Sequence, residues 1–214
     1  MVKNFSGKVI GFDLDGTLYR TNEKMDNQIK EYIFMRASEM LNREYLTVRK
    51  SFDENYSKNR SGSKSLQIIG IETNNAKNLM QSALENINID FIEKDKRLIK
   101  LIKDIHEKYK LFMITSNKKS IAIKKLDALD VDYRLFDPLI SYENNLFRED
   151  MSAFRYIAKE FRVNYNDILF VGDREQTDII PAKKIGIKTA IVNSESKLAD
   201  FRLKEIYDIK FILE

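Results

Sequence analysis

The stretch Lys8-Val9-Ile10-Gly11-Phe12-Asp13-Leu14-Asp15-Gly16-Thr17 is an apolar run that ends in an acidic turn. Residues 8–12 are expected to form a buried strand, because the apolar residues stop where the turn signal Asp15-Gly16 begins. Residues two apart in extended backbone point the same way, so the carboxylates of Asp13 and Asp15 should emerge together at the carboxyl end of that strand. Ligands of open α/β sheets bind at this end. The stretch therefore predicts one strand of such a sheet and a candidate site beside it.

Gly16 and Thr17 complete the turn. Gly16 lets the chain turn sharply and approach a ligand closely, and Thr17 offers a hydroxyl and a backbone N–H to an anion. A calcium loop is one alternative, but an EF-hand needs Gly at its sixth position and Glu at its twelfth. Counted from Asp13, those positions hold Leu18 and Lys24. The remaining alternative is an Asp-Gly turn that carries a second Asp without function.

Further strand-like runs alternate with stretches of helical spacing. The expected strands are residues 111–115, 168–171, 189–192 and 210–213, and the expected helices are residues 95–108, 120–129, 151–161 and 179–185. Strands that alternate with helices of this length indicate right-handed βαβ units. The pattern predicts an α/β fold with a parallel sheet covered by helices on both faces.

The region from residue 19 to residue 91 differs, because its apolar residues have helical spacing and no buried strand is evident. The expected helices are residues 29–41, 46–56 and 76–84, and residues 59–64 read as a loop by composition. We expect residues 1–18 and 92–214 to form the core domain. Residues 19–91 would form a helical cap that sits against this core as a lid.

The composition is that of one globular unit with an insertion: 214 residues, 43% hydrophobic and 33% charged. It excludes disordered, collagen-like and low-complexity classes. The chain has no cysteine, which excludes thiol chemistry and favours a reducing, cytoplasmic location. The first apolar run is about five residues long, too short for a signal-peptide core or a membrane span.

The formal net charge of +4 is spread over short basic pairs such as Lys118-Lys119 and does not form a patch. Nucleic acid is therefore not expected as a partner. A mild positive field favours a small phosphorylated substrate. We expect no membrane partner, and a monomer or a small homo-oligomer.

A second acidic pair, Asp173 and Asp178, follows the strand expected at residues 168–171. Two aspartates at the carboxyl edge of a sheet suit a hard cation such as Mg²⁺. The alternative is structural, with Asp178 or Thr177 as the N-cap of the next helix.

Two further elements supply groups that bind phosphate. Ser116 and Asn117 end the strand expected at residues 111–115, and they offer hydroxyl and amide donors to a phosphate oxygen. Arg148 precedes the helix that begins near Met151, where a fixed cation balances carboxylates and substrate charge.

Taken together and in this order, these residues resemble the haloacid dehalogenase superfamily of phosphotransferases. Its nucleophile motif is matched by residues 13–17, its Ser/Thr motif by Ser116, and its acidic motif by Asp173 with Asp178. The match covers the whole chain, and the block at residues 19–91 resembles the small helical cap of one subclass. The resemblance implies a Rossmann-like, three-layer core, a Mg²⁺ ion and a phosphoaspartate intermediate.

One motif departs from the family pattern. The family usually has a lysine, often followed by proline, where this chain has Arg148 followed by Glu149. Arginine still neutralises charge and binds phosphate bidentately, but it is larger and placed differently. Lys118 or Lys119 is the alternative source of this charge.

The resemblance also implies a role for each residue. Asp13 would attack the phosphorus, and Asp15 would protonate the leaving alcohol and then deprotonate the attacking water. Mg²⁺ would be held by Asp13, the backbone carbonyl of Asp15 and Asp173, with Asp178 a ligand through water. The residues expected to hold the phosphoryl group are Gly16, Thr17, Ser116, Asn117 and Arg148.

We therefore expect a Mg²⁺-dependent phosphatase of small phosphorylated metabolites. A diffuse similarity of residues 18–19, 29–33 and 63–66 to the pyrimidine 5'-nucleotidase-like branch favours nucleoside monophosphates. Arg60 and Lys64 in the cap loop are candidates to contact a polar group of the substrate. The alternatives are a phosphomutase, a sugar-phosphate or phosphoglycolate phosphatase, and a non-catalytic phosphate-binding protein. Dehalogenation is disfavoured, because Asp15 with the pair Asp173 and Asp178 indicates metal-assisted phosphate chemistry.

Overall fold

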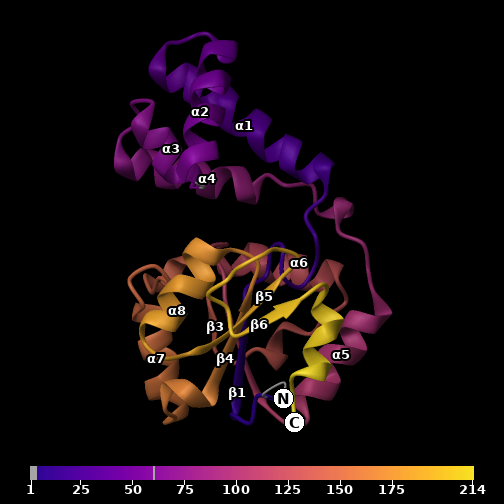
Figure 1. Cartoon of the computed structure of the whole chain (residues 1–214). Coiled ribbons are helices and arrows are strands. Elements are labelled where there is room, and N and C mark those ends of the chain that lie inside the picture. Colours follow the sequence, from indigo (N-terminus) through magenta and orange to yellow (C-terminus); the bar gives the residue numbers. More distant parts are fainter. Residues whose placement is uncertain (1–3, 60) are drawn as a thin grey trace. The chain divides into compact units, whose positions relative to one another are not determined.

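The computed structural model describes residues 4–59 and 61–214. Within them the chain forms two compact units (Figure 1). One consists of the chain up to Thr21 together with Ile92–Glu214, and the other is Asn22–Phe91. The inserted unit begins three residues later than the expected cap of residues 19–91 and ends at the same residue. The second unit is thus inserted into the first.

The larger unit is built on a sheet that has six parallel strands among the described residues, in the order β3-β2-β1-β4-β5-β6. The strands are β1 (Val9–Phe12), β2 (Lys110–Ile114), β3 (Leu139–Ile140), β4 (Ile168–Gly172), β5 (Lys188–Val192) and β6 (Phe201–Leu203). All four residues of β1 are buried, as expected for a strand with neighbours on both sides. Phe12 lies opposite Met113 of β2 and Val171 of β4. The residues that follow β1, β2 and β4 therefore meet at one edge.

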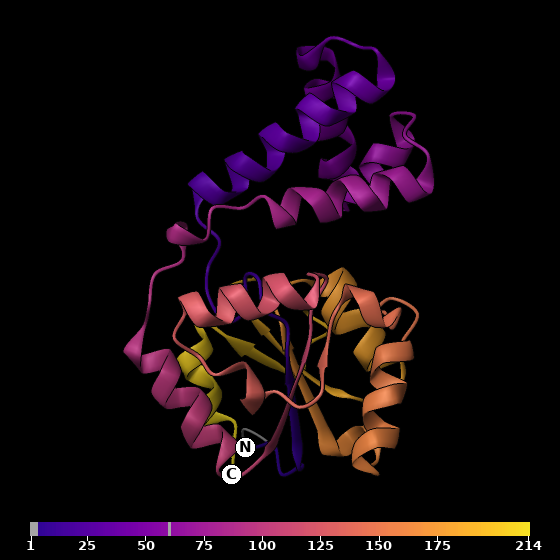
Figure 2. The ribbon, with the colours of Figure 1, turned by 180° about the vertical axis from the view of Figure 1, so that it is seen from behind.

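Helices cover both faces of this sheet. They are α5 (Lys96–His106), α6 (Lys119–Ala128), α7 (Ser152–Phe161) and α8 (Ile180–Lys184). In Figure 1, α7 and α8 lie on one side of the strands and α5 on the other, and the view from behind in Figure 2 shows the same layers. The core beneath α7 contains Phe154, Phe112 and Phe170, all fully buried. The prediction of a Rossmann-like α/β core is confirmed.

Four of the expected strands are confirmed, and two short edge strands, β3 and β6, were not predicted. The strand expected at residues 210–213 is wrong, because Ile206–Phe211 forms a 3₁₀ helix. Ile206, Ile209 and Ile212 are buried at a spacing of three, which is the period of that helix. The apolar run at the end of the chain thus belongs to a helical pattern.

The inserted unit contains four helices among its described residues: α1 (Glu23–Leu41), α2 (Tyr45–Asn59), α3 (Gly62–Ile68) and α4 (Thr73–Glu85). Phe34 of α1 and Phe52 of α2 meet edge to face in its core, with ring centroids 5.3 Å apart. This aromatic pair ties the first two helices together. The helical character predicted for this region is therefore observed.

The loop expected at residues 59–64 is wrong for its second half, where α3 begins. Ser61 is the N-cap of α3 and its side chain accepts a hydrogen bond from the backbone N–H of Lys64. Serine and glycine at this point thus start a helix, which Leu66 anchors in the core. Arg60, one of the two residues suggested to contact a substrate, lies outside the described residues.

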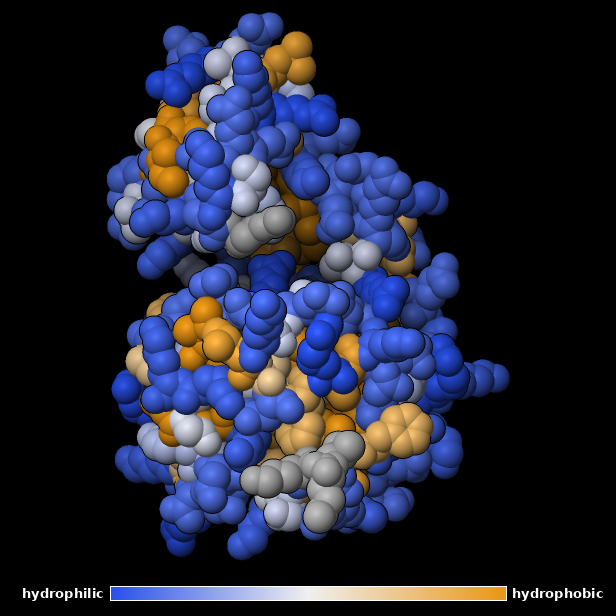
Figure 3. All heavy atoms as spheres, viewed as in Figure 1, coloured by the Kyte–Doolittle hydropathy of each residue, from blue (hydrophilic) through white to orange (hydrophobic). Residues whose placement is uncertain are grey.

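Apolar side chains are concentrated inside each unit. The face in Figure 3 is mainly hydrophilic, with small apolar patches on both units. Among the described residues, no helix combines the length and the apolar character needed to cross a membrane.

Phe154→Ala should lower the free energy of unfolding by about 3–5 kcal/mol, because it leaves a cavity beside Phe170, whose ring centroid is 4.9 Å away. Equilibrium denaturation with urea measures this loss. Tyr156→Ala removes an aromatic ring from the exposed side of the same helix and should cost less than about 1 kcal/mol. Equal losses in the two variants would contradict the packing described for α7.

Candidate active site

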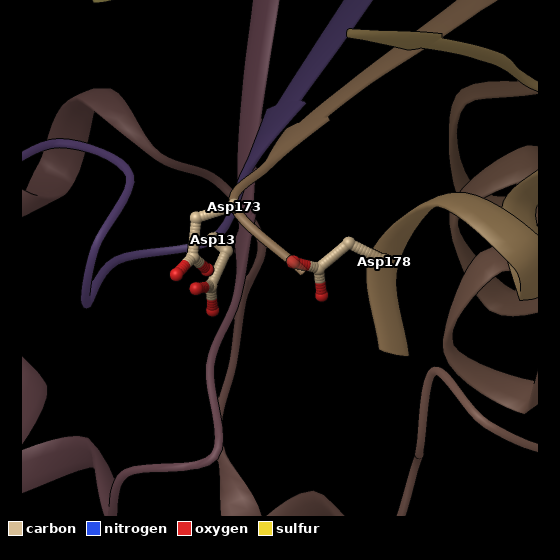
Figure 4. A group of neighbouring side chains, drawn as sticks. All are labelled: Asp13, Asp173 and Asp178. Atoms are coloured by element: carbon tan, nitrogen blue, oxygen red, sulfur yellow. The ribbon is translucent and has the colours of Figure 1, made fainter. Parts of the chain in front are cut away.

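Three carboxylates converge at the carboxyl edge of the sheet. Asp13 follows β1, Asp173 follows β4, and Asp178 lies in the π-helical turn Glu175–Ile179 that leads into α8. One oxygen of each lies within 4.8 Å of those of the other two. Figure 4 shows Asp13 and Asp173 side by side, with Asp178 reaching them from the start of the helix. The structure therefore brings together the two acidic motifs of the sequence.

Two glycines make this close approach possible. Gly16 has a φ of +83°, and a Cβ at this position would lie 2.3 Å from Oδ2 of Asp173. A Cβ on Gly172 would lie 2.4 Å from Oδ2 of Asp178. Any larger residue at either position would push a carboxylate out of the cluster.

Asp178 has a different structural role from the helix N-cap considered above. Its Oδ2 accepts a hydrogen bond from the backbone N–H of Arg174, four residues earlier, at 2.9 Å. The N-cap of α8 is Ile179, so the N-cap alternative is wrong for both Asp178 and Thr177. Instead, the hydroxyl of Thr177 donates to Oδ1 of Asp178 at 3.1 Å. Asp178 is thereby fixed, fully buried, beside Asp13.

Arg148 joins the carboxylates to the Ser/Thr motif. Its Nη1 lies 2.7 Å from Oδ1 of Asp13 and 2.8 Å from Oδ1 of Asp178. Its Nη2 donates to the hydroxyl of Ser116 at 3.2 Å. The side chain of Arg148 is 8% exposed, so both ion pairs are shielded from water. In contrast, Lys119 is exposed and its backbone N–H donates to Glu143.

Two of these carboxylates, Asp13 and Asp173, have a raised pKa, and burial is the main cause. Burial raises the pKa of Asp13 to about 7, with a further rise from Asp178 and Asp173, although Arg148 lowers it. Burial also raises the pKa of Asp173 to about 6, against the lowering influence of Arg174. Three carboxylates and one guanidinium leave an excess of negative charge, which a bound cation would offset.

The cluster fits a hard divalent cation. Oδ1 of Asp173 is buried and accepts no hydrogen bond from any described residue. A buried carboxylate oxygen without a donor is costly unless a cation binds it. Carboxylate oxygens are the ligands that Mg²⁺ prefers in proteins. Asp13, Asp173 and Asp178 are therefore suited to hold Mg²⁺.

Asp15 lies in a second polar group next to this cluster. Its Oδ1 accepts from Nζ of Lys125 at 2.7 Å and from the hydroxyl of Tyr19, and its Oδ2 accepts from Nδ2 of Asn117 at 2.5 Å. Burial is the largest influence on the pKa of Asp15 and raises it. The charge and hydrogen bond of Lys125, with the hydrogen bonds of Tyr19 and Asn117, outweigh burial and hold this pKa below its usual value. The contacts stabilise the ionised carboxylate.

Lys125 was not predicted as a site residue. The residue is fully buried on α6, yet its charge resembles that of the many exposed lysines. A signal was present, because Ile121, Ala122, Leu126 and Leu129 form the buried face of this helix and position 125 falls on the same face. A charged residue on an apolar helix face indicates a buried partner.

The expected phosphate-binding residues fall into separate environments. Ser116 is exposed beside Arg148, whereas Asn117 is buried and its amide nitrogen contacts Asp15 and Thr115. Thr17 is buried, and its backbone N–H donates to the carbonyl of Leu14 at 3.3 Å, so the turn itself uses that donor.

The sheet and the carboxylates at its edge define a Rossmann-like α/β protein with a candidate catalytic centre between the ends of β1, β2 and β4. A sequence profile of haloacid dehalogenase-like hydrolases matches residues 10–192. The chain belongs to this family, as the resemblance in the motifs indicated.

Solved structures of similar fold include both phosphatases and dehalogenases. A HAD phosphatase from Thermococcus onnurineus is 21% identical with a TM-score of 0.61, and the match covers 96% of this chain and 97% of that chain. A magnesium-bound putative HAD-hydrolase from Bacillus subtilis is 16% identical with a TM-score of 0.59, and the match covers 97% of this chain and 98% of that chain. A 2-haloacid dehalogenase from Pseudomonas syringae is 14% identical with a TM-score of 0.57, and the match covers 96% of this chain and 97% of that chain. No curated protein matches the sequence significantly. At these identities the similarity establishes the fold.

Arg148→Met should lower the free energy of unfolding by about 3–5 kcal/mol, because it leaves Asp13 and Asp178 buried without their cation. Chemical denaturation measures the change. Arg134→Met is the matched control, since it breaks an exposed ion pair with Asp132 and should leave the free energy of unfolding nearly unchanged. Similar losses in both variants would show that Arg148 does not compensate buried charge.

Proposed function

We propose that this chain is a Mg²⁺-dependent phosphatase that hydrolyses small phosphorylated metabolites through a phosphoaspartate on Asp13. The observation that carries the proposal is the guanidinium of Arg148, which lies between the carboxylate of Asp13 and the hydroxyl of Ser116. A phosphoryl group attacked by Asp13 would have both a cation and a hydroxyl beside it. Arginine binds phosphate oxygens in this way.

The metal would be held by the carboxylates of Asp13 and Asp173 and by the backbone carbonyl of Asp15, with Asp178 contributing through water. Bound there, Mg²⁺ supplies charge that offsets the repulsion between an anionic nucleophile and an anionic phosphate. Arg148 adds to this neutralisation from the side of Asp13 and Asp178.

The reaction divides into two displacements. In the first, an oxygen of Asp13 bonds to phosphorus as the bond to the alcohol oxygen breaks, and Asp15, in its minor protonated form, gives the alcohol its proton and becomes a carboxylate. In the second, Asp15 takes a proton from water, whose oxygen attacks the phosphoaspartate and releases inorganic phosphate. The three hydrogen bonds to Asp15 stabilise its ionised form, which is the base that the second displacement needs.

Dehalogenation is the competing activity, because the proteins of similar fold include dehalogenases. The number of carboxylates in the site favours a phosphatase over a dehalogenase. A second carboxylate at Asp15 and the pair Asp173 and Asp178 suit a metal and an acid–base step, which displacement of a halide does not require. We propose nucleoside monophosphates as the first substrates to test, followed by sugar phosphates and phosphoglycolate.

Asp13→Asn should reduce hydrolysis of p-nitrophenyl phosphate by at least about 10³-fold, because the amide is a poor nucleophile. EDTA should abolish the activity of the native protein, and added Mg²⁺ should restore it. Asp104→Asn, at an exposed aspartate of α5, is the matched control and should leave turnover unchanged. Release of halide from 2-chloropropionate with no release of phosphate would overturn the proposal in favour of the dehalogenase.

Binding of Mg²⁺ should strengthen as the pH rises from about 5 to about 7. The pKa of Asp13 is raised from 3.8 to about 7, so the folded chain holds a proton there that the unfolded chain has already released. The metal-free protein should therefore lose stability as the pH rises through this window. Mg²⁺ needs the ionised carboxylate, so its affinity should increase by up to about tenfold per pH unit for each proton displaced.

Calorimetric titration with Mg²⁺ and thermal denaturation without metal measure the two trends. The Asp13→Asn variant should lose this contribution to the dependence of stability on pH. An affinity that does not change with pH, or the same trend in stability in the variant, would contradict the raised pKa of Asp13.

A further inference from the structure

Lys125 is a fully buried lysine on α6, and the two displacements above give it no role beyond stabilising the charge of Asp15. Its Nζ lies 2.7 Å from Oδ1 of Asp15 and 2.9 Å from Oδ1 of Asn117. The ammonium thus connects the second carboxylate of the nucleophile motif with the amide that follows β2. It does so from a third element of the chain.

These contacts form a closed triangle. Lys125 donates to both Asp15 and Asn117, and Nδ2 of Asn117 donates to the other oxygen of Asp15 at 2.5 Å. Because an ammonium group only donates, it requires the oxygen of the Asn117 amide to face it. The nitrogen of that amide must then face Asp15 and the hydroxyl of Thr115, 2.7 Å away. Lys125 therefore selects one orientation of Asn117 and one position of Asp15.

We propose that Lys125 is a positioning residue, which holds the carboxylate of Asp15 in line for proton transfer to the leaving alcohol and from the attacking water. The inference rests on the proposed phosphatase function. A misplacement of about 1 Å in a reacting group lowers rates by about a hundredfold, so the position of Asp15 matters as much as its presence. Lys125 itself does not touch the phosphoryl group.

The burial of Lys125 favours this role over a purely structural one. An ammonium group is costly to remove from water unless it is paired and hydrogen-bonded. The neighbouring positions of the same helix face, Ile121, Ala122 and Leu126, are apolar and pack without that cost. A methionine would fill the position with similar volume, so packing alone does not require a charge there.

The test is Lys125→Met, assayed with two substrates. With an alkyl phosphate such as glycerol 2-phosphate, whose leaving group needs a proton, kcat should fall about a hundredfold with KM changed less than about threefold. With p-nitrophenyl phosphate, whose leaving group departs as an anion, the fall should be less than about tenfold. Lys124→Met makes the same change at the exposed neighbouring residue of α6 and should alter neither rate.

A double-variant cycle separates positioning from folding. In the Asp15→Asn background, the additional change Lys125→Met should reduce kcat less than about threefold, because the carboxylate that it positions is already gone. If Lys125→Met fails to fold, Lys125→Gln takes its place. This variant removes the ammonium group, so its kcat should fall more with the alkyl phosphate than with p-nitrophenyl phosphate. Equal losses with both substrates, or additive losses in the cycle, would overturn the proposal.

Failure of the phosphatase proposal is distinguished by the native protein. If the native protein hydrolyses neither substrate, the proposed function fails. Thermal denaturation of the same variants then tests whether Lys125 holds Asp15. If the fall in Tm of the double variant equals the sum of the falls of the single variants, Lys125 does not hold Asp15 and the inference fails as well. If the native protein is active and Lys125→Met retains full activity, only the inference fails.

Discussion

Compensation of buried negative charge is the constraint on which the rest of the site depends. Four aspartates, Asp13, Asp15, Asp173 and Asp178, lie at one edge of the sheet, and two buried cations face them. Arg148 pairs with Asp13 and Asp178, whereas Lys125 pairs with Asp15. With all four carboxylates ionised, two negative charges remain, which is the charge of one divalent cation. Burial is the main cause of the raised pKa of Asp13 and of Asp173, and neighbouring carboxylates add to it.

The central features of the fold follow from local patterns in the sequence. The apolar runs that became β1, β2, β4 and β5 are buried along most of their length, so composition alone predicts them. β3 and β6 escaped prediction because strands of two and three residues are too short to show a period. Residues 210–213 were mistaken for a strand because they read as a short apolar run. The spacing of three that marks the 3₁₀ helix is visible only when Ile206 and Ile209 are included.

The candidate site was predictable where its residues follow strands and unpredictable where they reach it from elsewhere. Asp13 and Asp173 follow β1 and β4, so the edge of the sheet brings them together without further information. The pairing of Arg148 with Asp178, and of Lys125 with Asp15, depends on where the loop before α7 and the helix α6 pack. Sequence patterns give the position of each residue on its own element, but they do not identify its partner on another.

The order of the strands has a consequence for the sequence of events during synthesis. β1 is made first, yet its neighbours are β2, about 100 residues later, and β4, about 160 residues later. Until those strands leave the ribosome, β1 has no edge to join, and its apolar residues remain without a partner. The helices of Asn22–Phe91 make their core from contacts within their own segment, so they are able to form in the meantime. The edge that carries the carboxylates is thus completed only after β4 has been made, although Asp13 follows the first of its three strands.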